Sequence, residues 1–210
     1  MQAADVQNPA KSRGRPRDPQ IEARVFDAAA KIYGDHGWSG YGFDAVARLA
    51  GVGKSSLYAR WASAAALLRD AIAFRWRGLM DIDNGNFADD MTAFATLVLT
   101  NVQQSGGRIP MHLRRDIATQ PEVRDTIGPI LVEVQLGCVA LVERAERRGE
   151  LRNHVSAEMI AEVLTSALEH YAARNASEAE HQKRVATTLD REASAYVTRL
   201  VDLILDGARN

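Results

Sequence analysis

Hydrogen-bond donors are concentrated on one short predicted helix, residues 54–60, which follows the turn Gly51-Val52-Gly53. Ammonium, guanidinium and hydroxyl groups suit the phosphate oxygens and base edges of DNA. No acid–base pair or nucleophile constellation can be read beside them, so we predict that these side chains bind rather than catalyse. The donors are Lys54, Ser55, Ser56, Tyr58 and Arg60.

A helix-turn-helix would position these donors. Counted from Phe43, the fifth residue is Ala47, where two crossing helices leave room only for a small side chain. The ninth is Gly51, at a turn that favours positive φ. The small core between the helices would be formed by Val46, Ala50, Val52 and Leu57. The pattern predicts helices over 43–50 and 54–60, the second entering the major groove by its N-terminal end.

The stretch 46–61, VARLAGVGKSSLYARW, closely resembles the signature of the TetR family of regulators, and the specific resemblance covers about residues 18–68. It implies a phosphate contact for Tyr58, and contacts to bases or phosphates for Lys54, Ser56 and Arg60. Two positions depart from the family pattern: Gly42 stands where a hydroxyl residue often caps the first short helix, and Ala64 where a lysine often contacts the backbone. The predicted DNA-binding set includes Gly42 and Phe43.

A basic arm precedes the helices. Residues 11–17, KSRGRPR, resemble an AT-hook, an extended segment that lies in the minor groove. Narrow A·T-rich grooves concentrate negative potential and attract arginine. We therefore predict DNA contacts for Arg13, Arg15 and Arg17, with a solvated basic tail as the alternative.

Composition and charge agree with a DNA-binding region at the N-terminal end of the chain. Residues 1–62 carry nine Lys/Arg and six Asp/Glu, whereas the remainder of the 210-residue chain is acidic. A basic front on an acidic body indicates that only the front meets a polyanion. The single cysteine, Cys138, excludes an intrachain disulfide and fits a reducing compartment. No signal peptide or membrane span is apparent, so we expect a cytoplasmic protein.

Apolar residues recur with helical spacing along the chain, and no strand pattern is visible, so the predicted fold class is all-α. We expect a flexible arm over 1–17, a three-helix DNA-binding domain over 18–62, and a C-terminal bundle of about six helices over 63–210. Within the bundle, Ser63 and Ser156 are predicted N-caps. Residues 81–90 are predicted as an acidic loop, Gly128-Pro129 as a helix interruption, and 175–188 as a polar segment open to helical extension.

The family resemblance also implies regulation. It predicts a homodimer that binds a pseudo-palindromic double-stranded operator, with helices over about 156–174 and 189–207 at the interface, and repression relieved by an unidentified small molecule. The stripe Val197, Leu200 and Ile204 is the expected interface, with service to the monomer core as the alternative. Candidate ligand-binding residues, each also suited to plain core, are Phe94, Val98, His112, Gln135 and Cys138.

Other functions are disfavoured. Gly53-Lys54-Ser55 resembles the end of a phosphate-binding loop, but Arg48 stands where that motif needs glycine. The five histidines include no pair three or four residues apart, so we expect neither metal nor cofactor. Trp61 is expected to anchor the small DNA-binding core, and Trp76 to be core or to line a cavity. Control by a protein partner instead of a ligand remains the alternative.

Overall fold

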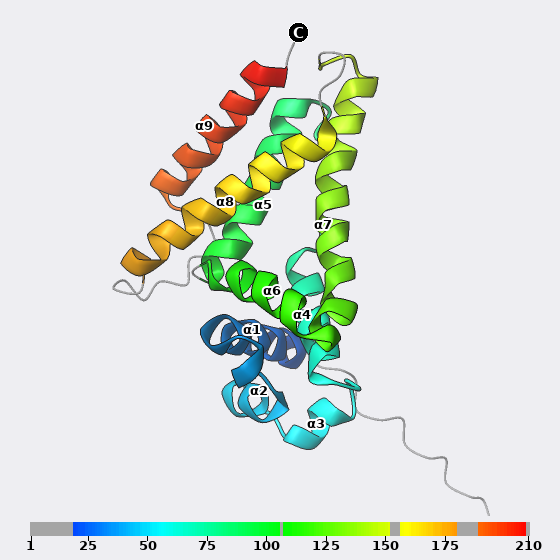
Figure 1. Cartoon of the computed structure of the whole chain (residues 1–210), viewed down its shortest axis with the longest axis vertical. Helices are drawn as coiled ribbons and strands as arrows, with labels where there is room; N and C mark the ends of the chain where they lie inside the picture. Colours follow the sequence, from blue (N-terminus) through cyan, green and yellow to red (C-terminus); the bar gives the residue numbers. More distant parts are fainter. Residues whose placement is uncertain (1–18, 106, 152–155, 180–188, 209–210) are drawn as a thin grey trace, which may run out of the picture.

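The structure is a computed structural model that describes residues 19–105, 107–151, 156–179 and 189–208. Within these residues the chain is helical, and nine α-helices and one 3₁₀ helix follow one another (Figure 1). Their bounds are α1 Pro19–His36, η1 Trp38–Gly40, α2 Phe43–Ala50, α3 Lys54–Tyr58, α4 Ala64–Arg75, α5 Phe87–Gln104, α6 Arg108–Thr119, α7 Pro121–Arg147, α8 Ala157–Ala179 and α9 Arg191–Ala208.

Helices α1 to α3 form one end of the molecule, below α4 and α6 in Figure 1. Their apolar faces meet in a cluster around Phe26, Leu57 and Trp61, where the rings of Phe26 and Trp61 pack edge to face at 5.9 Å. The Trp61 indole N–H donates to Asp70 on α4 at 2.9 Å. Trp61 therefore anchors the DNA-binding core and joins it to the next helix, as the sequence predicts.

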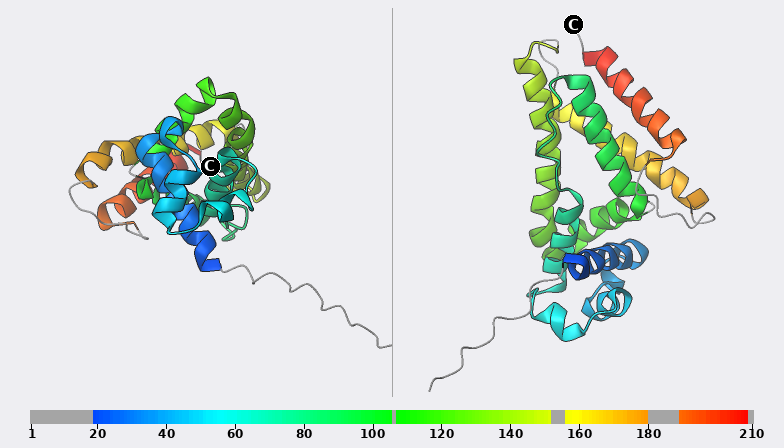
Figure 2. Two further views of the ribbon diagram at one scale, coloured as in Figure 1. Left: turned by 90° about the horizontal axis from the view of Figure 1, so that it is seen from below. Right: turned by 180° about the vertical axis from the view of Figure 1, so that it is seen from behind.

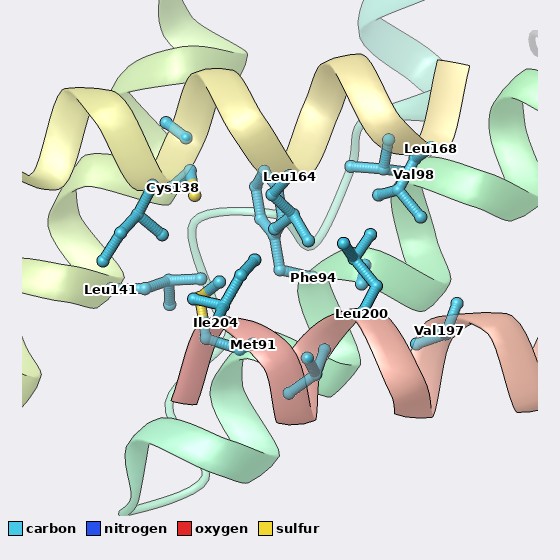
Figure 3. Close-up of a cluster of buried hydrophobic side chains, with 14 of the residues drawn as sticks. Met91, Phe94, Val98, Cys138, Leu141, Leu164, Leu168, Val197, Leu200 and Ile204 are labelled. Atoms are coloured by element: carbon cyan, nitrogen blue, oxygen red, sulfur yellow. The ribbon is translucent and has the colours of Figure 1, made fainter. Parts of the chain in front are cut away.

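Helices α5, α7, α8 and α9 form the other end (Figures 1 and 2). The buried side chains of these four helices converge on one apolar cluster, in which Phe94 and Leu164 are fully buried (Figure 3). Helix α4 packs against both α1 and α7, and α6 packs against α1 and α7. Two helices therefore connect the two ends of the molecule.

Several helix ends are set by side-chain caps. The Ser63 hydroxyl accepts from the Ala66 N–H at 3.1 Å, and the Ser156 hydroxyl accepts from the Met159 N–H at 3.1 Å, so both predicted caps are confirmed. The predicted loop over 81–90 is too long, because Asn86 caps α5 through the Asp89 N–H at 2.9 Å. Helix α4 begins directly after its Ser63 cap and ends at Arg75.

Helix α7 corrects one prediction. It continues through Pro129, whereas the sequence predicts an interruption at Gly128-Pro129. Proline removes one backbone hydrogen bond, and here it lies on an exposed side of the helix, where water can solvate the freed carbonyl. By length and composition α7 could also cross a membrane, which the sequence analysis did not anticipate. In the structure it packs against α4, α5, α6 and α8, as a central helix of a helical domain does.

Candidate DNA interface and ligand cavity

The predicted helix-turn-helix has the required backbone geometry. Helix α2 ends at Ala50, and its C-cap Gly51 has a φ of 67°, in the left-handed region that glycine adopts without strain. Ala47 is 6% exposed where the helices cross, and Val46 and Leu57 are buried between them. The Val52 N–H donates to the Ala47 carbonyl at 3.1 Å and closes the turn. The steric pattern that predicted the motif therefore matches the observed packing.

Helix α3 presents its polar side chains to solvent. Lys54, Ser55, Ser56, Tyr58 and Arg60 are all exposed, and Arg60 follows the last helical residue by two positions. Lys54 forms an ion pair with Asp44 at the start of α2, which raises the pKa of the lysine. The N-terminal end of α3 is therefore accessible to a partner. Its lysine, Lys54, is paired with the carboxylate of Asp44.

The other predicted DNA contacts differ in their placement. The Phe43 side chain is 7% exposed and packs edge to face on the Tyr58 ring at 4.7 Å, so it positions Tyr58 from within the core. Gly42 is the N-cap of α2 and supplies no side-chain cap, as its residue type predicts. Arg13, Arg15 and Arg17 lie outside the described residues, so the minor-groove role of the arm stays a prediction.

A cavity of about 440 Å³ lies between α4, α5, α6, α7 and α8. Its walls are mostly apolar, with polar groups contributed by all five helices, which is typical of small-molecule sites of this size. Of the predicted ligand-binding residues, Val98 and Gln135 line it, and Trp76 forms part of the wall. Its other lining residues include Ile72, Arg75, Asn101, Val102, Leu113, Leu131 and Thr165.

Three predicted ligand residues do not line this cavity. Phe94 and Cys138 belong to the apolar cluster farther along α5 and α7 (Figure 3), because each faces the interior of the bundle. Burial raises the pKa of the Cys138 thiol to about 12, as in an inert core thiol. His112 is on the side of α6 that meets α1, with its ring 6.0 Å from that of Tyr33.

Helix α6 joins the cavity to the DNA-binding end. Its residues Ile109 and Leu113 line the cavity, whereas Asp116 contacts α1 and η1. The Asp116 carboxylate is 2% exposed and accepts from the Tyr33 hydroxyl and the Trp38 N–H, each at 2.9 Å. Burial acts to raise the pKa of Asp116, but these donors and Arg115 outweigh it, so the pKa is lowered.

The predicted dimer stripe has a different role from the one expected. Val197, Leu200 and Ile204 are each less than 10% exposed and pack against α5 and α8 within the same chain (Figure 3). They serve the core of the monomer because α9 covers the open side of the α5–α8 pair. The large apolar side chains that α8 and α9 leave exposed are Met159, Val163 and Leu203.

Two polar residues where α4 and α6 meet α1 escaped the sequence analysis: Arg75, which is partly buried, and Asp116, which is buried. Arg75 ends α4 and resembles a cation that stabilises a helix C-terminus, although it lines the cavity. Asp116 lies among the arginines of α6 and resembles an exposed helical residue. A polar residue every third or fourth position on a helix can face solvent or a second domain, and only tertiary contacts distinguish the two.

Comparisons with known proteins agree with both ends of the structure. Residues 25–71 match the model "Bacterial regulatory proteins, tetR family", and residues 81–191 match "Tetracyclin repressor-like, C-terminal domain". The HTH-type transcriptional regulator AqdR of Rhodococcus erythropolis is 29% identical over 149 residues, which are 70% of this chain and 72% of that protein.

Solved structures show the same fold. The fatty acid degradation regulator FadR from Bacillus halodurans superposes with a TM-score of 0.70 at 14% identity, over 92% of this chain and 98% of that chain. FadR from Bacillus subtilis, solved in complex with stearoyl-CoA, gives 0.66 at 14% identity, over 88% and 97%. Two family models, matched in order along one helical chain, identify this protein: it belongs to the TetR family of DNA-binding transcription regulators, which are not enzymes.

Proposed function

We propose that this regulator is a cytoplasmic homodimeric repressor that a small molecule releases from its operator. One observation carries the proposal: the cavity is bounded by α4 and α6, the two helices that also pack against α1. A ligand that fits the cavity better in one arrangement of these helices shifts the equilibrium between two spacings of the DNA-reading helices. The complex of the Bacillus subtilis relative with stearoyl-CoA supports this use of the fold.

A two-fold operator follows from the dimer. Two α3 helices, one from each protomer, would occupy successive major grooves about 34–36 Å apart. Lys54 and Arg60 are exposed for base or phosphate contacts, and Tyr58 for a phosphate. Selection from a random DNA library should return a pseudo-palindrome with half-sites one helical turn, or a multiple of it, apart. An asymmetric single site would contradict the proposal.

The exposed apolar residues of α8 and α9 are suited to the dimer interface. Leu203 is 69% exposed, so Leu203→Glu should leave the folded chain intact while burying a charge in a dimer. Light scattering should give about 46 kDa for the unmodified 23.0 kDa chain and a monomer for the variant. Met111→Glu, on α6 at a position that is 59% exposed, is the control and should remain dimeric. A monomeric unmodified protein would contradict the dimer.

The regulatory half of the proposal is tested at the mouth of the cavity. Gln135 is exposed and lines the cavity, whereas its neighbour Leu136 is exposed and does not. Compounds that raise the melting temperature of the protein should also release the selected DNA. Gln135→Trp should abolish both effects while DNA binding persists, and Leu136→Trp should preserve them. If compounds stabilise the protein but leave its DNA binding unchanged, control by a protein partner is favoured over control by a ligand.

A further inference from the structure

Arg75 is the most buried cation on the wall of the cavity that the proposed function uses. Its side chain is 16% exposed, at the C-terminal end of α4. The residues beside it on the wall include Ile72, Trp76 and Val98. Arginine stays protonated in proteins, and burial lowers the pKa of Arg75, an effect that Asp27 partly offsets. The cavity therefore contains a positive charge in largely apolar surroundings.

The protein compensates this charge incompletely. The terminal nitrogens of Arg75 contact the Gln104 side-chain oxygen and lie 3.6 Å from the carboxylate of Asp27. Asp27 is 74% exposed, so water screens that pair. The Arg75 Nε is buried and has no hydrogen-bond partner among the described residues. A buried donor of this kind is costly unless an acceptor reaches it.

The other charges of the cavity do not offer the same opportunity. Arg114 on α6 is paired with Glu169 on α8, and burial raises the pKa of Glu169 more than Arg114 lowers it. Glu162 is exposed on α8. Helix α8 packs on α5, α7 and α9, whereas α4 packs on α1 and α7. The acidic side chains are thus carried by a different wall from the one that carries Arg75.

We propose that the effector is an amphiphile with an apolar body and one anionic oxygen head, and that Arg75 binds this head. The inference rests on the proposed ligand-binding role of the cavity and specifies its chemistry. A charge-assisted hydrogen bond from the accessible part of the guanidinium would compensate this charge, and a small turn of the side chain toward the head would give Nε the acceptor that it lacks. The apolar walls would take up the body of the ligand. Because Arg75 also faces Asp27 on α1, the head would bind where α4 meets the DNA-binding helices.

Three decyl compounds with different heads test the inference by calorimetric titration of the full chain. Decanoate should bind at least tenfold more tightly than 1-decanol, which is the range expected for a hydrogen bond to a charged group. Decyltrimethylammonium should bind more weakly than either. Decanoate should also release the selected DNA at lower concentration than decanol does.

Variants assign the preference to one side chain. Arg75→Met keeps an unbranched side chain as far as the Nε position but carries no charge, so it should remove the preference for decanoate while leaving decanol binding intact. Arg114→Met, on the same cavity but in an existing ion pair, should keep the preference. Arg75→Lys retains the charge without the Nε donor, so it should keep part of the preference for decanoate over decanol. If Arg75→Met does not fold by circular dichroism, the Arg75→Lys result decides.

The outcomes separate this inference from the proposed function. Equal binding of decanoate and decanol to the unmodified protein, or tighter binding of the cation, would overturn the anionic head while the ligand cavity stands. A preference that survives Arg75→Met, or that Arg75→Lys leaves undiminished, would overturn the role of Arg75. Failure of all three compounds to bind would count against both the inference and the cavity as a ligand site.

Discussion

The helices that present the DNA-reading residues and the helices that enclose the cavity use their side chains differently. The space between the short helices around α2 and α3 is filled by Phe26, Leu57 and Trp61. The buried ring of Phe43 packs against the exposed ring of Tyr58. Between α4 and α8, about 440 Å³ is left open. A DNA-binding domain must hold its hydrogen-bond donors in fixed positions, whereas a ligand-sensing domain must have two arrangements of similar energy. The comparison predicts that substitutions at the two ends have different consequences.

The largest effect is expected for Trp61→Ala. It removes a ring packed on Phe26 and the hydrogen bond to Asp70, and large-to-small substitutions of this kind cost about 3–5 kcal/mol. Denaturant unfolding followed by circular dichroism should show the loss, and DNA binding should fall with it. Trp76→Ala removes the same ring from the cavity wall, so it is the matched comparison and should cost less. Equal losses would show that the two ends are packed alike.

Asp116→Asn tests the contact between the ends. The amide offers one acceptor oxygen where the carboxylate serves three donors, so we expect a loss of about 1.5–3 kcal/mol in unfolding free energy. Tyr33→Phe removes one of these bonds and should cost less. Because the pKa of Asp116 is lower in the folded protein, the carboxylate stabilises the fold above its unfolded pKa of about 3.9. That contribution should disappear as the pH falls through the lower folded value, and Asp116→Asn should abolish this part of the pH dependence.

Within the DNA-binding domain, substitutions of Lys54 and Tyr58 should affect DNA sequence preference differently. Lys54 is at the end of α3 expected to enter the groove, so Lys54→Ala should change the preference at one base pair of each half-site by roughly 5- to 150-fold. Tyr58→Phe should weaken all sequences about equally, because a phosphate contact carries no base identity. Binding to single-base operator variants measures both. A changed base preference in Tyr58→Phe with a uniform loss in Lys54→Ala would reverse the docking of the helix.

The smallest effect is expected for Asp44→Asn. It frees Lys54 from an exposed ion pair, and such pairs contribute little to stability. Unfolding should therefore be unchanged, while affinity for unrelated DNA should rise slightly and become more dependent on salt. Asp89→Asn, an exposed carboxylate at the start of α5, is the control and should leave DNA binding unaltered. Weaker binding by Asp44→Asn would mean that Asp44 itself contacts DNA.

The two ends also differed in how well the sequence predicted them. The helix-turn-helix could be predicted because its demands are local: Ala47 and Gly51 satisfy steric constraints set within a dozen residues. The cavity is built by side chains from residue 72 to residue 169, so its lining depends on how five helices cross. Sequence periodicity found the inward faces, which include Val98 on the cavity wall, but it could not separate a cavity wall from filled core at Phe94.

The prediction that failed most clearly was the interruption at Pro129. Proline disfavours the interior of a helix, but the tertiary contacts that α7 makes with four other helices outweigh one missing hydrogen bond. Arg75 and Asp116 were missed for a related reason. Their burial is created by the approach of α1 to α4 and α6, which no pattern within a single helix reports.

The place of Trp76 has a practical consequence. The chain has three tryptophans, and Trp76 lies on the cavity wall, whereas neither Trp38 nor Trp61 lines the cavity. An indole in that position emits light whose colour and intensity follow the polarity of its surroundings. When a molecule displaces water from the cavity, the emission of Trp76 changes directly, because it is the one of the three tryptophans that lines the cavity. The protein thus carries a built-in optical reporter of occupancy, and candidate effectors can be screened on the unlabelled chain.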